Sequence, residues 1–382
     1  MARKKLTKVA EQAPSREAWQ RLYTAAAAFK AAAPWELMTE DEIFGVEDPE
    51  TGIVNYCLVT GELGEHHALI VTLGPQGLGE YYDAIRRMQI SAGPLEQEDA
   101  GFCMMAAPQI QASFEDRDFL TDDDLQIIKS LGLRFRGPLA WPMFRYYKPG
   151  RAPWYVEREA ARILTLALEQ ALQVYTDVDW IDEQYEDHPD ELDDRLPVRY
   201  FDGNAWAYRW DVSNPMYPQY EYPINEEQLT NIAQQIPTKK ARWELHMTVL
   251  PDMVQEGPLP PYLPYMLLLA DNESGLLLNQ KVLLAQPSLE AMLQALPQEL
   301  LAMFEQLNMR PQQLFVATER LQRILTPTLA HLGVQLKRLD ALPVIEDALN
   351  AFRDFLESDD LDDEDWGADD WDLTEWDVKE AA

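Results

Sequence analysis

The sequence predicts an α+β N-terminal domain, then an α/β C-terminal domain, with a disordered acidic tail at the end. The chain has 382 residues and is 47% hydrophobic, which is enough for two cores of ordinary size. After an N-terminal helix, its first half continues with strands that lead into another helix, whereas its second half alternates strands and helices. We place a basic arm and N-terminal helix at 1–34, the α+β domain at 35–212, a Pro/Tyr-rich linker at 213–240, the α/β domain at 241–356 and the tail at 357–382.

Apolar periodicity and turn residues predict the elements of the first half. A stretch rich in helix formers follows Ser15 and ends before Pro34, and the segment 48–52 (Asp-Pro-Glu-Thr-Gly) suits a tight turn between two strands. Thr121 is expected to cap a helix, because its hydroxyl and the three acids after it suit a helix N-terminus. The predicted helices are 16–32, 80–88, 122–130 and 157–174, and the predicted strands are 43–46, 53–60, 68–73 and 198–208.

The second half has a more regular pattern. Its predicted strands are separated by helices long enough for crossover connections, which is typical of an α/β layer. The predicted strands are 243–250, 265–270, 276–284, 313–316 and 334–339, and the predicted helices are 288–307, 319–332 and 343–356.

Charge and cysteine content restrict the possible partners and compartment. The net charge of −34 repels phosphate backbones and anionic lipids, so we expect no membrane partner and consider direct nucleic-acid binding unfavourable. Cys57 and Cys103 are too few for a disulfide framework or a thiolate metal cage. With no signal peptide and no apolar run of bilayer length, the sequence predicts a cytoplasmic protein without a cofactor or a metal site.

The tail combines dense negative charge with regularly spaced tryptophans. From Glu357 to Asp377 twelve residues are acidic, with no Lys or Arg among them. A five-residue step turns about 140° around a helix axis, so the three tryptophans cannot share one helical face. We predict that the tail binds a basic or grooved protein partner; the alternative is a solubilising appendage. The residues expected to bind the partner are Asp365, Trp366, Asp370, Trp371, Glu375 and Trp376.

Three acids are weak candidates for catalysis. Asp271 is expected to end a strand, and Glu319 and Asp340 each follow a later strand, so they could meet at one edge of the sheet. A ribonuclease-H-like phosphodiesterase with two divalent metal ions needs such a group of carboxylates. Each acid also suits an ordinary turn or a helix N-terminus. Whether the protein is an enzyme therefore stays open.

Three other stretches have two interpretations each. Basic and aromatic residues alternate in the proline-rich stretch 141–154, which could form a ligand surface or simply seal an irregular loop over the sheet. The glycines at 74–79 could hold a phosphate or form an ordinary strand-to-helix turn. The ten acids between 176 and 194 lack calcium-loop spacing, which favours a solvated loop. The residues of the possible ligand surface are Trp141, Arg145, Lys148, Arg151 and Trp154.

Two parts of the chain resemble an uncharacterised bacterial two-domain family, with a domain of unknown function in each half. The N-terminal resemblance includes 34–64, the Trp-Pro-Met-Phe segment at 141–144 and the segment 148–154. The C-terminal resemblance covers 264–356, with Arg-Pro at 310–311 and Leu-Pro at 342–343. The resemblance implies a cytosolic two-domain protein and assigns no activity or residue roles. We therefore predict a non-enzymatic protein-interaction module; the alternatives are the metal-dependent phosphodiesterase and an acidic mimic of nucleic acid.

Overall fold

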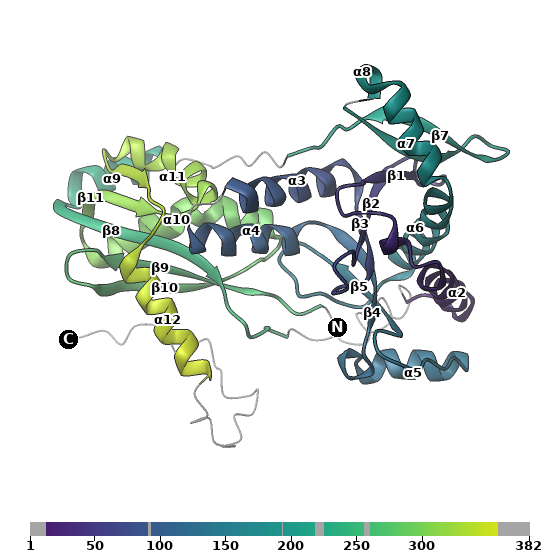
Figure 1. Ribbon diagram of the computed structural model, residues 1–382. Helices are drawn as coiled ribbons and strands as arrows, with labels where there is room; N and C mark the ends of the chain where they lie inside the picture. The colour runs from purple at the N-terminus through teal and green to yellow at the C-terminus, as the bar shows by residue number, and fades with distance from the viewer. Residues whose placement is uncertain (1–12, 91–92, 193, 218–224, 256–259, 358–382) are drawn as a thin grey trace.

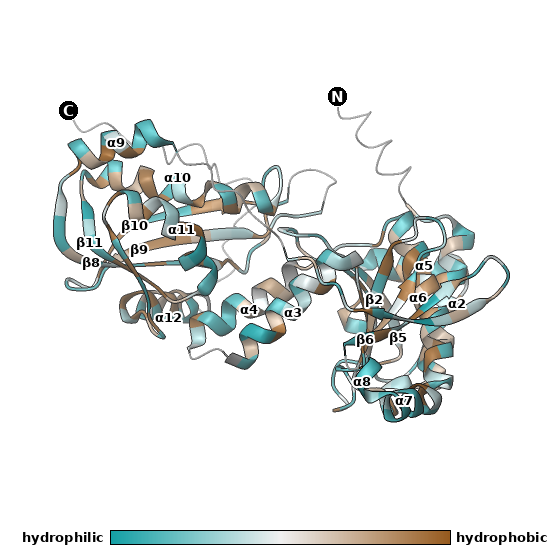
Figure 2. Cartoon of the chain, turned by 90° about the horizontal axis from the view of Figure 1, so that it is seen from above, coloured by the Kyte–Doolittle hydropathy of each residue, from teal (hydrophilic) through white to brown (hydrophobic). Residues whose placement is uncertain are grey.

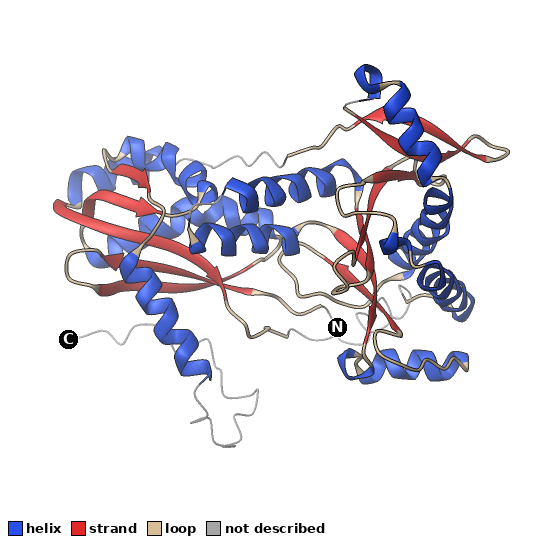
Figure 3. Ribbon diagram, in the orientation of Figure 1, coloured by secondary structure: helices blue, strands red, loops and turns tan. Residues whose placement is uncertain are grey.

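The computed structural model describes residues 13–90, 93–192, 194–217, 225–255 and 260–357. It contains helices and mixed sheets in two regions, as the sequence predicts (Figure 1). Figure 3 shows that helices flank both sheets, and Figure 2 shows that α3 and α4 lie between the two sheet-containing lobes. Within the described residues, no helix is both long and apolar enough to cross a bilayer.

The N-terminal sheet has seven strands in the order β5-β4-β3-β2-β1-β6-β7. Neighbouring strands are antiparallel except β1 and β6, which are parallel, so β6 and β7 extend the sheet beyond the predicted meander. Strand β5 occupies the first part of the aromatic stretch 141–154, for which an irregular loop was one of two interpretations. The strands are β1 (Phe44–Glu47), β2 (Val54–Thr60), β3 (Ala68–Thr72), β4 (Gln109–Glu115), β5 (Trp141–Tyr147), β6 (Arg195–Phe201) and β7 (Trp206–Val212).

Two long helices and a shorter one cover one face of this sheet. Helix α2 begins after Ser15, whose hydroxyl accepts a hydrogen bond from the Ala18 amide, and it ends at Ala33 in the left-handed region. Thr121 caps α5 as predicted, and Gly132 ends that helix with a φ of 74°. The core on this face includes Phe29 and Leu164. The helices are α2 (Arg16–Ala32), α5 (Asp122–Leu131) and α6 (Arg158–Thr176).

Helices α3 (Gly74–Ile90) and α4 (Pro94–Ala106) form a hairpin that joins the two regions. The first turns of α3 pack on the opposite face of the N-terminal sheet through Leu78 and Tyr81. Helix α4 instead packs on the C-terminal sheet, where Leu95 contacts its apolar cluster. The sequence pattern did not predict α4. The hairpin therefore carries part of the N-terminal half into the C-terminal core.

The C-terminal sheet has five strands in the order β10-β9-β8-β11-β12. Strands β8, β9 and β10 form an antiparallel meander, while β11 and β12 run parallel to β8. The predicted order of strands and helices is confirmed here. The elements are α9 (Glu226–Gln235), β8 (Thr238–Val249), β9 (Pro264–Asp271), β10 (Leu276–Leu284), α10 (Leu289–Leu307), β11 (Arg310–Val316), α11 (Glu319–His331), β12 (Gln335–Arg338) and α12 (Pro343–Glu357).

The central strand β8 presents different side chains to the two faces of this sheet. Side chains alternate between the faces of a strand. Its apolar residues enter the core formed by α9, α10 and α11, whereas its polar residues face α4 and α12. The apolar set is Trp243, Leu245 and Met247, and the polar set is Glu244, His246 and Thr248.

The structure corrects two expectations for connecting segments. The acidic interval after α6 forms α7 (Val178–Asp187) and α8 (Pro189–Leu192), because Ile181 anchors α7 in the N-terminal core. The glycines at 74–79 lie inside the first turns of α3. A side chain at Gly79 would collide with the Met216 backbone, so this glycine permits close packing. Helix α9 coincides with the stretch 226–235 of the linker, whose sequence is helix-like, and it packs in the C-terminal core.

Candidate functional site

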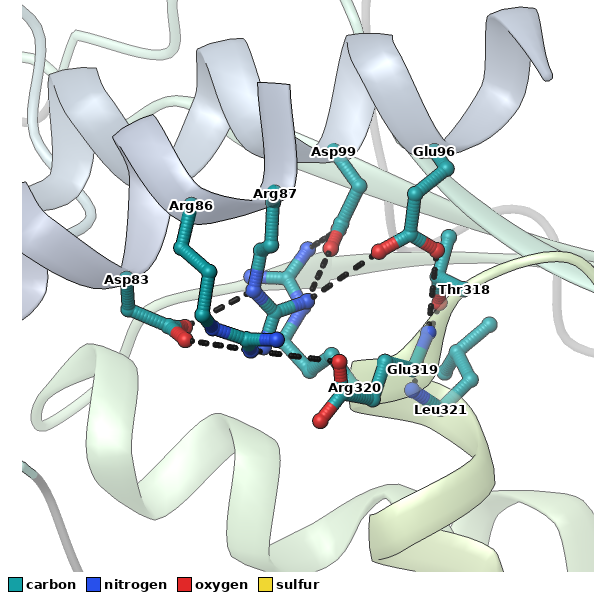
Figure 4. Close-up of polar contacts among 9 residues, drawn as sticks. All are labelled: Asp83, Arg86, Arg87, Glu96, Asp99, Thr318, Glu319, Arg320 and Leu321. Carbon is teal, nitrogen blue, oxygen red and sulfur yellow. Dashed lines mark hydrogen bonds and ion pairs between the residues drawn. The ribbon is translucent and has the colours of Figure 1, made fainter. Parts of the chain in front are cut away.

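Charged side chains from α3, α4 and α11 meet at the junction of the two regions (Figure 4). We call this group the seam cluster. It contains three arginines and four acids, so its opposite charges nearly balance. Its members are Asp83, Arg86, Arg87, Glu96, Asp99, Glu319 and Arg320.

Arg87 lies at the centre of the seam cluster and is 1% exposed. Its Nε donates to Asp83 Oδ2 at 2.7 Å, and its Nη1 donates to Asp99 Oδ2 at 3.3 Å and lies 3.5 Å from Glu96 Oε1. Burial alone would lower the pKa of Arg87, but the surrounding negative charges raise it above its ordinary value. Arg87 therefore stays charged and needs these acids to be stable in the interior.

Asp99 connects the two regions directly. Its Oδ1 accepts from Arg320 Nη2 on α11, while its Oδ2 accepts from Arg87 on α3. The Asp99 side chain is 2% exposed, and Arg320 is also buried. A carboxylate shared by two buried guanidinium groups compensates both charges at once.

Glu96 on α4, in the N-terminal half of the chain, caps helix α11 of the C-terminal region. Its Oε2 accepts a hydrogen bond of 3.0 Å from the Glu319 amide, next to the Thr318 hydroxyl that accepts from the Leu321 amide at 3.2 Å. Burial raises the pKa of Glu96, while the bond from this amide acts in the opposite direction. A carboxylate at this position also interacts favourably with the helix dipole.

Glu244 performs the same role for α12 from the central strand β8. It is fully buried and accepts hydrogen bonds from the Val344 amide at 3.0 Å and the Ile345 amide at 3.1 Å. The Asn272 side chain also donates to it. The acid in the middle of the polar face of the sheet is therefore used to hold a helix in place.

A groove lies beside the seam cluster, between α4, β8 and α12. Its volume is about 690 Å³, and most of its surface is apolar. Such a volume lies in the range of small-molecule and side-chain binding sites. The residues that line the groove include Glu98, Gly101, Thr248, Leu349, Phe352 and Arg353.

His246 lies on β8 near this groove and has an unusual environment. It is 1% exposed, and neither of its ring nitrogens has a hydrogen-bond partner among the residues that the structure describes. Burial lowers the pKa of His246 to about 4, although the nearby Glu98 acts in the opposite direction. The Glu98 carboxylate itself accepts a hydrogen bond from the Thr248 hydroxyl. His246 is therefore a neutral, buried imidazole at neutral pH.

The three acids proposed for catalysis belong to no metal-binding group within the described part of the chain. Asp271 pairs with Trp243 at the end of β9, and its Oδ1 accepts from the Glu273 amide in the turn. Glu319 accepts from Arg86 at 3.2 Å as part of the seam cluster. Asp340 lies after β12, where its carbonyl is close to Gly93. The geometry therefore assigns Asp271 and Glu319 to a turn and to a helix N-terminus.

Each basic residue of the proposed ligand surface has a partner within the chain. Arg145 forms a bidentate pair with Asp124 at 2.7 and 3.0 Å, and Lys148 lies 2.6 Å from Glu157. The guanidinium of Arg151 stacks on the Tyr262 ring, 3.2 Å from its centroid. Of the two tryptophans, Trp141 packs edge-on against Phe135 and Trp154 against Tyr155. These contacts secure β5 and brace the loop after it against the C-terminal region.

Asp365, Trp366, Asp370, Trp371, Glu375 and Trp376 lie outside the described residues. Their partner binding stays a prediction from sequence.

Sequence reasoning missed the seam cluster, because its two halves come from distant parts of the chain. Arg320 follows Asp99 by 221 residues. A local signal does exist: Asp83 and Arg87 are four residues apart, and Glu96 and Asp99 are three apart, which places each pair on one helix face. That signal could have indicated two polar helix faces in contact, without naming α11 as their partner.

Comparison with known proteins identifies two families. Residues 19–193 match a domain of unknown function (DUF7309), and residues 228–353 match a second domain of unknown function (DUF6930). No curated protein and no solved structure matches the chain. The matches confirm the resemblance to domains of unknown function in both halves.

Proposed function

We propose that this chain is a non-enzymatic protein-interaction module. Its residues 19–193 belong to the DUF7309 domain family and its residues 228–353 to the DUF6930 domain family. Its partner is a protein with a basic surface and apolar pockets. The acidic segment after α12 supplies the contacts, and the two-domain body supplies a rigid base for it. On its sequence features the protein acts in the cytoplasm.

The observation that carries this proposal is the position of the groove beside the last turns of α12. Leu349, Phe352 and Arg353 line it, and Glu357 ends α12 one turn later. A largely apolar binding surface and the start of the acidic segment are therefore adjacent on the molecule. This arrangement favours binding over catalysis, since the buried acids nearby are already engaged in holding helices and arginines.

The chemistry of the segment indicates the kind of partner. Residues 357–382 include thirteen acids against the single Lys379, a net charge of −12. Burial of a tryptophan side chain supplies about 1.5–3 kcal/mol, so three tryptophans can offset the cost of ordering the segment. Negative charge would bring a basic partner close, and the tryptophans would then provide most of the affinity.

An affinity capture from host lysate tests this function. The full chain is compared with a chain that ends at Leu356, and with a variant in which Trp366, Trp371 and Trp376 are all replaced by Ala. We expect the full chain to retain a discrete protein that both altered chains lose. A matched control replaces three scattered acids, Asp359, Asp362 and Asp369, with Asn and should keep most of the binding.

Three results would contradict or redirect the proposal. Equal retention by the full and shortened chains would remove the segment from the function. Equal losses for the tryptophan and acid variants would mean that charge alone is recognised. Recovery of a DNA-binding protein that 0.5 M salt releases completely would indicate the nucleic-acid mimic instead.

A further inference from the structure

The groove beside α12 has an apolar lining but contains nothing from the described chain. Its wall combines residues of α4, the end of β8, and the side chains of Leu349 and Phe352 on α12. A mostly apolar hollow of about 690 Å³ is well suited to an aromatic side chain. Exposed apolar surface of this kind commonly marks a binding site.

The charges around the groove cancel, which sets it apart from the rest of the protein. Asp99 is compensated by Arg87 and Arg320, and Glu98 lies 3.7 Å from Arg353. The chain outside residues 357–382 has a net charge of −22, the difference between −34 and −12. An acidic segment is therefore repelled by most of this protein but not by the groove.

The chain itself supplies a segment of suitable chemistry next to the groove. Twenty-five residues follow Glu357, which lies four residues after Arg353. Their large aromatic side chains are Trp366, Trp371 and Trp376. The nine residues from Glu357 to Trp366 can span up to about 30 Å, so this tryptophan can return to the groove.

We propose that the groove binds the acidic segment of the same chain, with the indole of a tryptophan, first of all Trp366, inserted between α4 and α12. Covalent attachment makes this binding intramolecular, with an effective concentration on the order of millimolar. Because its connection to α12 is shorter, Trp366 has an effective concentration at the groove about two- to threefold higher than that of Trp376. Docking therefore needs only a weak intrinsic affinity.

This inference goes beyond the partner-binding function and stands without it. If both hold, the groove competes with the partner for the same tryptophans, and binding of the partner releases the segment. The two events differ in their response to salt. Salt weakens attraction between the segment and a basic partner, whereas it screens the repulsion between the segment and its own acidic protein.

The test uses the full chain labelled with 5-fluorotryptophan and ¹⁹F NMR. The chain has eleven tryptophans, and single Trp→Phe variants assign the three that follow α12. We expect the Trp366 resonance to be displaced from the position of solvent-exposed tryptophan and to have the line width of the folded protein. Raising NaCl from 50 to 500 mM should preserve or strengthen this signature.

A blocking variant tests the position of the docking site. Gly101 lines the groove from α4, and a Cβ added there meets no atom within 4 Å, so the side chain of Gly101→Leu can begin without a clash and occupy space in the groove. The Trp366 resonance should then become narrow and move to the solvent-exposed position. The matched control is Gln97→Leu, which adds the same side chain at an exposed position of α4 and should change nothing.

Three outcomes would overturn the inference. One is that all three tail resonances are narrow and solvent-exposed in the unaltered chain. Another is a displaced resonance that Gly101→Leu leaves in place, since the site would then lie elsewhere. The third is a displacement that disappears on dilution, because a second copy would then be the occupant. None of these results bears on capture of a partner from lysate, so failure here is distinguishable from failure of the proposed function.

Discussion

Both faces of the C-terminal sheet are buried, yet its central strand β8 presents apolar side chains to one face and polar side chains to the other. On one face, which we call the apolar face, α10 and α11 cover apolar residues such as Leu245 and Leu314. On the other, which we call the polar face, α4 and α12 cover the polar row of β8 and the apolar residues Leu268 and Phe315 beside it, and α4 also carries Asp99 of the seam cluster. The apolar face is made within one domain, whereas the polar face receives a helix from the other half of the chain. Burial in this protein therefore has two purposes: the apolar face stabilises the domain, and the polar face fixes which elements dock on it.

Of the changes considered, removal of the Asp99 carboxylate should lower the free energy of unfolding the most. Asp99→Ala leaves Arg87 and Arg320 buried without their shared carboxylate, and loss of one partner of a buried ion pair costs about 3–5 kcal/mol. Urea unfolding followed by circular dichroism measures the change. The control is Glu299→Ala, which removes the partner of Lys281 in a more exposed pair between α10 and β10 and should cost at most about 1 kcal/mol. Similar costs for the two variants would show that the seam cluster contributes no more than a surface pair.

His246 should make the polar face sensitive to acid. The unfolded chain binds a proton at this histidine near pH 6.5, whereas the folded chain does so only near pH 4. Because the unfolded state binds more protons between these values, stability should fall by about 2–4 kcal/mol as the pH falls from 6.5 to 4. The charged groups that act on this imidazole are Glu98 on α4 and Arg320 on α11.

A substitution isolates this effect. His246→Leu should remove most of the loss of stability between pH 6.5 and 4, and it should not destabilise the fold at pH 7.5, where both ring nitrogens lack partners within the described chain. The measurement is the urea midpoint at several pH values. His188→Leu, at an exposed position between α7 and α8, should keep the original pH dependence. An unchanged pH profile in His246→Leu would mean that this histidine is already protonated in the folded state.

The helix caps on the two faces allow a finer comparison. Glu244→Gln weakens the buried cap of α12 and should cost about 1–3 kcal/mol. Oε2 of Glu244 accepts from the Val344 and Ile345 amides and Oε1 accepts from the Asn272 side chain, whereas a glutamine offers only one acceptor oxygen and a neutral group for these donors. On the apolar face, Ser288 caps α10 by accepting from the Ala291 amide at 3.1 Å, and Ser288→Ala should cost about 1 kcal/mol. Hydrogen exchange at the first turn of each helix locates the effect. A loss spread evenly over both domains would contradict a local role for Glu244.

The contrast between the apolar and the polar face of the C-terminal sheet also explains which elements could be predicted from the sequence. The elements of the C-terminal domain follow from apolar periodicity, because each packs against its neighbours along the chain. Helix α7 was mistaken for a loop, because its acids conceal the few anchoring residues, Ile181 and Tyr185. Helix α4 and the seam cluster were missed, since their charges indicate a solvated surface until α11 is placed opposite them. A polar pattern that is buried by a distant element has no local signature.

The smallest expected effect concerns a glycine in the middle of α4. Gly101 has helical conformation and open space where a side chain would begin, so neither strain nor close packing requires it. Gly101→Ala should therefore stabilise the fold by about 0.5–1 kcal/mol, measured as a rise in the urea midpoint. A glycine that lowers helix stability while widening the groove is consistent with selection for what the groove binds rather than for stability. If Gly101→Ala instead destabilises the protein, α4 needs flexibility at this position, and the width of the groove is not the reason for the glycine.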